Sequence, residues 1–151
     1  MDFFQEIADN YILVCAICGW CAAQILKTLI HLLVNKKFQA ERLVGSGGMP
    51  SSHSATVCAL ATATAFECGV SSPLFAIAVI LAIIVMYDAR GVRRETGKQA
   101  QVLNDLLKAF ADMGRTDLKA DEKLKELVGH TPLQVLAGAI LGICIAVGLH
   151  M

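Results

Sequence analysis

The sequence predicts an all-α fold, a polytopic membrane helix bundle with about four transmembrane helices and an interfacial amphipathic helix. The first observation is composition: 56% of the 151 residues are hydrophobic and only 17% are charged, with a mean hydropathy of +0.59. The second is that several apolar runs approach the length needed to cross ~30 Å of hydrocarbon. The third is that all thirteen lysines and arginines lie between Lys27 and Lys125. This length is typical of one domain, so residues 1–151 are predicted to form a single integral-membrane unit.

The first apolar run, residues 11–34, is the clearest predicted span. It is long enough to cross the membrane as one helix. Lys27 and His31 interrupt its second half, four residues apart on one helix face. Because ionisable groups are unfavourable in lipid, these side chains are expected to face the bundle interior or to extend toward the interface.

Two shorter apolar runs follow, at residues 54–70 and 74–87, separated by a turn at 67–73. The first is rich in Ala and Thr, which permit close helix–helix contact in lipid. Each run is short for an independent span. They are therefore predicted to form a helical hairpin packed among neighbouring helices.

The character of the chain changes at Asp88, where a highly charged segment directly continues the third apolar run. Residues 99–113 have apolar side chains at helical spacing, which predicts the amphipathic helix. The later elements are predicted to be a loop at 114–120, a short charged helix at 121–128 ending at Gly129, and an apolar helix at 132–149. In this last helix Gly138 and Gly142 are four residues apart, as in small-residue packing faces.

The distribution of basic residues predicts the topology. Apart from Lys27, they occupy the segments 35–52 and 88–131, whereas both chain ends and the turn at 67–73 have none. Four spans place the two basic segments on the same side, which the positive-inside rule makes cytoplasmic. The first ten residues are acidic rather than basic, so no cleavable signal peptide is expected. The chain is therefore predicted to be integral to a membrane, with both basic segments on the cytoplasmic side.

The six cysteines lie mostly inside apolar runs, so a disulfide framework is not expected. Cys18 and Cys21 have the spacing of a redox motif but lack its βαβ context. Packing in the helix bundle is the favoured interpretation. A bundle this small encloses little core, so a homodimer packed through Ala, Gly and Cys faces is expected.

Residues 45–55 read Gly-Ser-Gly-Gly-Met-Pro-Ser-Ser-His-Ser-Ala. Pro50 suits the first turn of a helix, and Ser51 or Ser52 is expected to cap that helix. The amides and dipole at such a helix start favour anion binding, and His53 would stand on the first turn. The alternative interpretation is an ordinary Gly-rich turn followed by a capped helix.

Three sequence blocks resemble the divergent branch of the type 2 phosphatidic acid phosphatase superfamily, which is related to acid phosphatases and vanadium haloperoxidases. The blocks are Gly48-Met-Pro-Ser-Ser-His-Ser-Ala, Tyr87-Asp-Ala-Arg-Gly-Val-Arg-Arg and Gly129-His-Thr-Pro. Pro50-Ser51-Ser52-His53 is similar to the second signature of the superfamily, Pro-Ser-Gly-His. The hydropathy pattern extends the resemblance to nearly the whole chain.

The superfamily has three signature blocks, and this sequence departs from the first and the third of them. Lys36 and Arg42 are separated by five residues instead of six, and no proline follows Arg42. Gln134 stands where the third block has an aspartate, and Leu124 stands where it has an arginine. Arg90, Arg93 or Arg94 would have to supply the missing guanidinium, or the phosphate site is degraded.

The resemblance implies a phosphatase that acts on a lipid phosphate or polyprenyl pyrophosphate through a phosphohistidine intermediate, without a metal or other cofactor. His130 would be the nucleophile and His53 the general acid. The implied substrate-binding groups are Lys36, Arg42, Gly47, Gly48, Ser51, Ser52, Arg90, Arg93 and Arg94. A nucleophilic histidine needs a hydrogen-bond acceptor on its other nitrogen. Gln134 can accept one, and Glu126, Asp88 or Glu95 are alternatives.

Two other functions stay open. One is a catalytically inactive protein that binds phosphate headgroups or acts as a scaffold, which the missing third-block residues favour. The other is a small-solute channel or transporter, suggested by Lys27 and His31 within a span. The expected partners are a phosphorylated lipid substrate and membrane lipids. The formal net charge of zero gives no bias toward nucleic acid.

Overall fold

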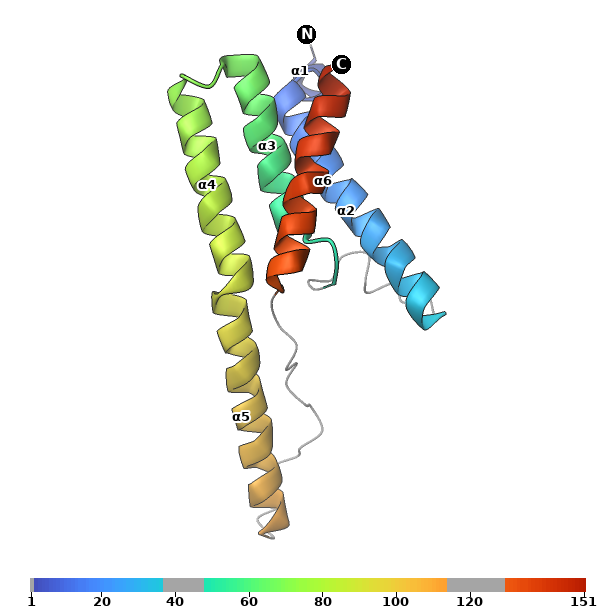
Figure 1. Ribbon diagram of the computed structural model, residues 1–151, viewed down its shortest axis with the longest axis vertical. Helices are drawn as coiled ribbons and strands as arrows, with labels where there is room; N and C mark the ends of the chain where they lie inside the picture. The colour runs from blue at the N-terminus through green and yellow to red at the C-terminus, as the bar shows by residue number, and fades with distance from the viewer. Residues whose placement is uncertain (1, 37–47, 114–129) are drawn as a thin grey trace.

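The computed structural model describes residues 2–36, 48–113 and 130–151. These residues form α helices and, within the described ranges, no strand (Figure 1). The helices are α1 (Phe3–Ala8), α2 (Tyr11–Asn35), α3 (Ser52–Cys68), α4 (Pro73–Arg90), α5 (Val92–Asp112) and α6 (Pro132–His150). The predicted all-α class is confirmed. The predicted loop at 114–120 and short helix at 121–128 lie outside the described residues.

Three stretches of helix are long and apolar enough to cross a membrane: Tyr11–Asn35, Pro73–Phe110 and Pro132–His150. The described chain is therefore a membrane helix bundle. The fourth member of the bundle, α3, has 17 residues and spans about 25 Å at ~1.5 Å per residue. It is the least apolar of the four, and its neighbours shield it.

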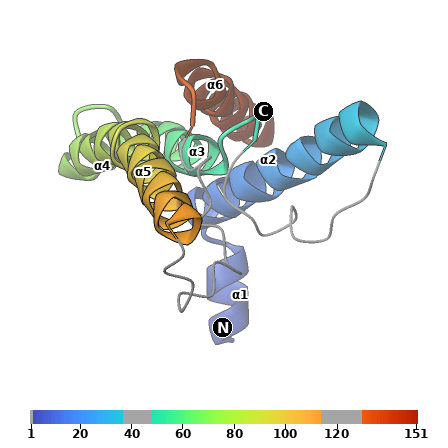
Figure 2. The same cartoon turned by 90° about the horizontal axis from the view of Figure 1, so that it is seen from below.

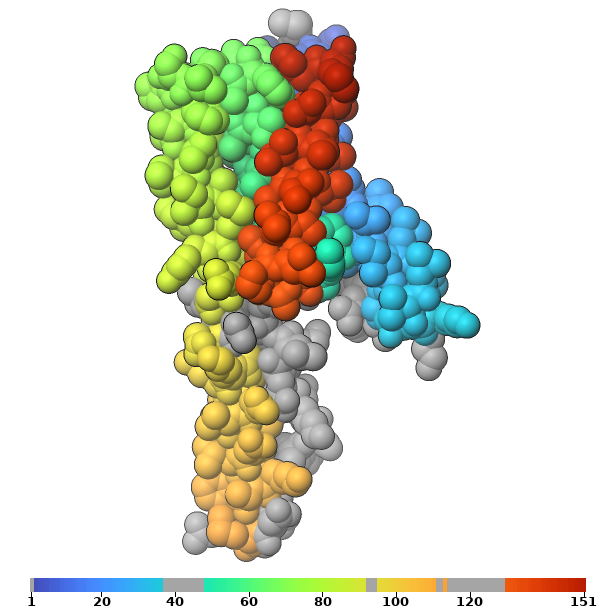
Figure 3. All heavy atoms as spheres, viewed as in Figure 1, coloured from blue at the N-terminus to red at the C-terminus, as the bar shows by residue number. Residues whose placement is uncertain are grey.

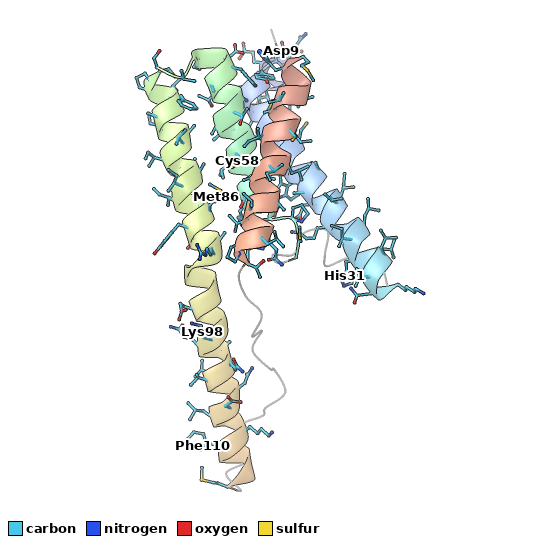
Figure 4. The ribbon with its side chains drawn as sticks, viewed as in Figure 1. Asp9, His31, Cys58, Met86, Lys98 and Phe110 are labelled. Atoms are coloured by element: carbon cyan, nitrogen blue, oxygen red, sulfur yellow. The ribbon has the colours of Figure 1, made fainter. Side chains whose placement is uncertain are left out.

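Helix α3 is the centre of the bundle and contacts α2, α4 and α6. Seen along the bundle, the other three helices surround it (Figure 2). The side chains at its buried positions are mostly small. Ala55, Ala59 and Ala63, for example, are all 0% exposed. Small side chains let helix backbones approach closely, which replaces the hydrophobic effect as the main source of packing energy in lipid. Cys58 of α3 also faces Met86 of α4, with their sulfur atoms 3.8 Å apart (Figure 4).

Helices α3 and α6 run in the same direction and are in very close contact (Figure 1). A Cβ added at Gly138 would lie 2.3 Å from the carbonyl oxygen of Ser51, and one at Gly142 would lie 2.2 Å from that of Ala55. Only glycine fits at these two positions. The predicted packing face of α6 is therefore the face that holds it against α3.

Both chain termini and the turn between α3 and α4 lie at one end of the bundle (Figure 1). The end of α2, the start of α3, the end of α4 and the start of α6 lie toward the other. These are the helix ends that border the two basic segments, as the charge distribution predicted. Which side of the membrane this end faces stays a prediction. In its C-terminal part, α2 diverges from α6 (Figure 3).

Four local features differ from the sequence expectations. Helix α1 was not predicted. Helix α3 begins at Ser52 with Ser51 as its N-cap, so the placement of Pro50 in the first turn was wrong. The amphipathic helix α5 begins at Val92 rather than near residue 99. It also continues the direction of α4 past the end of the bundle, as the positions of Lys98 and Phe110 show (Figure 4).

Candidate active site

The structure brings His53 and His130 together although they are distant in sequence. Their ring centroids are 6.0 Å apart, with an angle of 60° between the ring planes. His53 is the second residue of α3, and His130 immediately precedes the N-cap of α6. His130 is 3% exposed, whereas His53 is partly exposed. The two imidazoles therefore lie side by side at the paired starts of two parallel helices.

Capping residues set where these two helices begin. The Ser51 hydroxyl accepts a hydrogen bond from the Ser54 N–H at 3.4 Å, which makes Ser51 the N-cap of α3. Thr131 caps α6, with Pro132 in the first turn. Thr131 and Gln134 form a capping box, in which each side chain accepts a bond from the other residue's backbone N–H. Local sequence thus fixes the start of each helix.

Backbone hydrogen bonds join three elements around the histidines. The Ser51 N–H donates to the Gln134 carbonyl oxygen at 3.0 Å, which ties the start of α3 to the first turn of α6. The His130 N–H donates to the Ala89 carbonyl oxygen at 3.0 Å, which ties the start of α6 to the last turn of α4. His130 is therefore held by its backbone as well as by its side chain.

Gln134 determines which nitrogen of His130 is protonated. Its Oε1 atom accepts the Thr131 N–H at 3.0 Å and lies 3.2 Å from Nδ1 of His130. Because a backbone N–H only donates, the atom at this position is the amide oxygen, and Nδ1 of His130 must be the donor to it. In the neutral ring the lone pair is then on Nε2. Gln134, one of the proposed orienting residues, therefore contacts the His130 ring.

Electrostatics at this end of the bundle favour an anion. The positive ends of the α3 and α6 dipoles lie close together at these helix starts. Phosphate groups bind at such helix starts. The parallel arrangement of α3 and α6 brings two of these starts to one place.

The serines of the Pro50-Ser51-Ser52-His53 motif are buried and do not line open space. Ser51 is 0% exposed and Ser52 is 5% exposed. Ser54, which sequence reasoning did not select, is 0% exposed, and its hydroxyl has no hydrogen-bond partner among the described residues. Its Cβ lies next to Gly138 at the α3–α6 contact. The first turn of α3 therefore contains a buried hydroxyl whose hydrogen-bond partner is not found among the described residues.

The structure places only some of the predicted cationic and orienting groups. Lys36 is exposed at the end of α2, and Arg90 is exposed at the end of α4. Asp88 is partly buried in the last turn of α4 and makes interactions there. Gly48 borders the start of α3. Arg42, Gly47, Glu126 and the side chains of Arg93 and Arg94 lie outside the described part of the structure.

Among the residues that the structure describes, no three His, Cys, Asp or Glu side chains gather in a way that would bind a metal ion. All six cysteines lie in the described ranges and are free thiols. Cys15 and Cys58 are buried in the bundle, as the packing interpretation expects, whereas Cys144 is exposed.

The fold and these contacts define a class: a small polytopic helical membrane protein with two histidines at paired helix starts. The chain belongs to the Divergent PAP2 family, whose model matches residues 8–145. It is 42% identical over 147 residues to the uncharacterised membrane protein YuiD of Bacillus subtilis (strain 168), covering 92% of this chain and 93% of the relative. No solved structure matches. The predicted resemblance to the divergent branch is confirmed.

Proposed function

We propose that this protein hydrolyses a phosphorylated lipid, a phosphate monoester or a polyprenyl pyrophosphate, through a phosphohistidine on His130. The observation that supports this most directly is the pairing of His53 with His130 at 6.0 Å between ring centroids, together with the Gln134 contact on Nδ1 of His130. These contacts leave the Nε2 lone pair of His130 as the nucleophile.

The proposed reaction has two steps. First, Nε2 of His130 attacks phosphorus, and a P–N bond forms as the bond to the leaving oxygen breaks. Protonated His53 gives its proton to that oxygen, which leaves as an alcohol or a phosphate. Second, neutral His53 takes a proton from water, and the resulting hydroxide attacks phosphorus. The P–N bond breaks, inorganic phosphate leaves, and both histidines return to their starting states.

The helix starts would stabilise the charge that develops on the phosphoryl oxygens. Backbone N–H groups fixed in advance do not have to reorganise during the reaction, so they stabilise the transition state more than water can. The contacts of Ser51 with Gln134 and of His130 with Ala89 provide this fixed geometry.

A lipid substrate is supported by the position of the site at one end of a membrane bundle. The surface of α4 above the site is apolar and exposed, with Ile80 at 56%, Ile83 at 54% and Ile84 at 59%. A lipid whose tail lies along such a surface would present its headgroup near the helix ends. From the charge bias of the loops, we propose that this headgroup is on the cytoplasmic face of the bacterial cytoplasmic membrane.

The second candidate is a protein that binds phosphate headgroups without turnover. Gln134 favours it, because an amide at 3.2 Å from His130 holds the ring without stabilising the imidazolium as a carboxylate would. In that case the helix starts would still bind the anion.

The two candidates are distinguished by phosphate release. Purified protein in detergent would be incubated with a panel containing phosphatidic acid, a phosphatidylglycerol phosphate and a polyprenyl pyrophosphate. The phosphatase proposal expects release from at least one, lost in His130→Ala. Binding of a panel member with no release from any would support the headgroup-binding candidate and overturn the phosphatase.

A further inference from the structure

A lysine is buried inside the bundle and is not used in the mechanism above. Lys27, about two turns before the end of α2, is 2% exposed. Its Nζ atom donates a hydrogen bond to Oε1 of Gln24 at 2.7 Å, and Gln24 is 5% exposed. This bond to the neutral Gln24 side chain fixes the position of the ammonium group. Ionisable residues inside membrane bundles usually have a functional role.

The packing of α2 on α3 places this ammonium at the level of the site. A Cβ at Gly19 of α2 would lie 3.0 Å from the Ala55 carbonyl oxygen, which fixes the register of the two helices. Gln24 is five residues further along α2, roughly 7–8 Å at 1.5 Å per residue. Helix α3 runs antiparallel to α2. A shift of the same length along α3 from Ala55 and Ala59, toward the start of that helix, therefore reaches its first turn. That turn contains Ser52 and His53.

A second contact independently places Lys27 beside the start of α3. Gly48 has a φ of +88°, and a Cβ there would lie 3.2 Å from Cγ and 3.4 Å from Cδ of Lys27. Gly48 lies three residues before the Ser51 N-cap. The aliphatic part of Lys27 therefore supports the segment that leads into α3. Its ammonium group points back along α2 to Gln24, as helical side chains do.

We propose that Lys27 is a phosphate-binding residue of this site, and that it replaces the arginine missing before His130. The inference rests on the anion site of the proposed function. A lysine binds phosphate as a point charge, and Gln24 would hold this one toward the first turn of α3. The Ser54 hydroxyl, which belongs to that same turn of α3 and has no partner among the described residues, would be a further group for the same oxygens. Lys27 would contact the phosphoryl group from the bundle side.

The test measures inorganic phosphate binding by the full-length protein in detergent, by calorimetry and by phosphate inhibition of any turnover. Lys27→Met should weaken phosphate binding at least tenfold, and Lys27→Arg should recover part of it. Gln24→Glu keeps a partner for Nζ, but its carboxylate competes with phosphate, so affinity should also fall. The matched control is Lys98→Met, since Lys98 is exposed on α5, where it pairs with Glu95 at 2.6 Å. It should bind like the wild type.

Each outcome decides the inference. Folded Lys27→Met with wild-type phosphate affinity overturns it. If Lys27→Met does not fold, Gln24→Leu decides, because it removes the acceptor that holds Nζ without adding a charge. A purely structural Lys27 then predicts unchanged phosphate affinity, whereas the proposal expects a loss. Wild-type protein that binds phosphate through Lys27 but hydrolyses nothing supports this role and overturns the phosphatase. Turnover by Lys27→Met with an unchanged KM supports the phosphatase and overturns the role of Lys27. Wild-type protein that does not bind phosphate overturns both proposals.

Discussion

Oε1 of Gln134 lies 3.2 Å from Nδ1 of His130 and 3.0 Å from the backbone nitrogen of Thr131. One amide oxygen therefore completes the N-terminal cap of α6 and fixes the ring of the candidate nucleophile. Because both bonds use the same atom, the local folding of α6 and the reactivity of His130 are coupled. In the superfamily pattern a carboxylate stands at this position and would meet the same two donors.

This double contact predicts different results for two substitutions of Gln134. Gln134→Leu removes both bonds, so it should reduce stability by about 1 kcal/mol through the lost cap. It should also lower kcat by roughly tenfold, the value of one lost hydrogen bond to the ring. Gln134→Glu keeps the capping box and adds a carboxylate, so kcat should be unchanged or higher. Equal loss of kcat in both variants, measured by phosphate release, would contradict the orienting role.

The two histidines should differ in their response to the leaving group. His53→Ala should slow hydrolysis of alkyl phosphates by roughly 10²–10⁴-fold, the usual contribution of general acid catalysis. The loss should be smaller for aryl phosphates, whose leaving oxygens need less protonation. His130→Ala should abolish turnover of both substrates and leave phosphate binding largely intact. A His53→Ala loss that is the same for alkyl and aryl phosphates would assign His53 to binding.

The glycine contacts between α3 and α6 predict a position-specific loss of stability. Gly138→Ala places a methyl group where a Cβ would lie 2.3 Å from the Ser51 carbonyl oxygen. The helices must separate at the site, which should cost about 1–3 kcal/mol and lower phosphate affinity. Gly148→Ala is the matched control, because nothing lies within 4 Å of a Cβ there. Thermal unfolding in detergent checks both, and equal melting temperatures would refute the close contact.

The topology predicts that two exposed positions are labelled from opposite sides of the membrane. Val70, in the turn between α3 and α4, is 72% exposed, and Met113, after α5, is 65% exposed. On a background without the six native cysteines, Val70→Cys and Met113→Cys would be treated with a membrane-impermeant maleimide in oriented vesicles. Met113→Cys should react from the cytoplasmic side only. Labelling of both from one side would contradict the four-span arrangement.

The sequence by itself determined the fold class and the helix ends that carry His53 and His130. Apolar runs, capping residues and the placement of basic residues are local properties, and each can be read without knowing which helices touch. The capping potential of Ser51 and the acceptor role of Gln134 belong to this group, since both act within four residues of their partners.

Only the tertiary structure decided which of these local features meet. The 6.0 Å separation of His53 and His130 depends on the parallel packing of α3 on α6. That packing depends on two glycines whose spacing is visible in the sequence, but whose partners, the Ser51 and Ala55 carbonyl oxygens, are not. The same holds for Lys27, which in sequence is a charge interrupting a span and in the fold adjoins the start of α3. Contacts between distant residues depend on helix register and direction, which close packing of small side chains sets and local sequence does not.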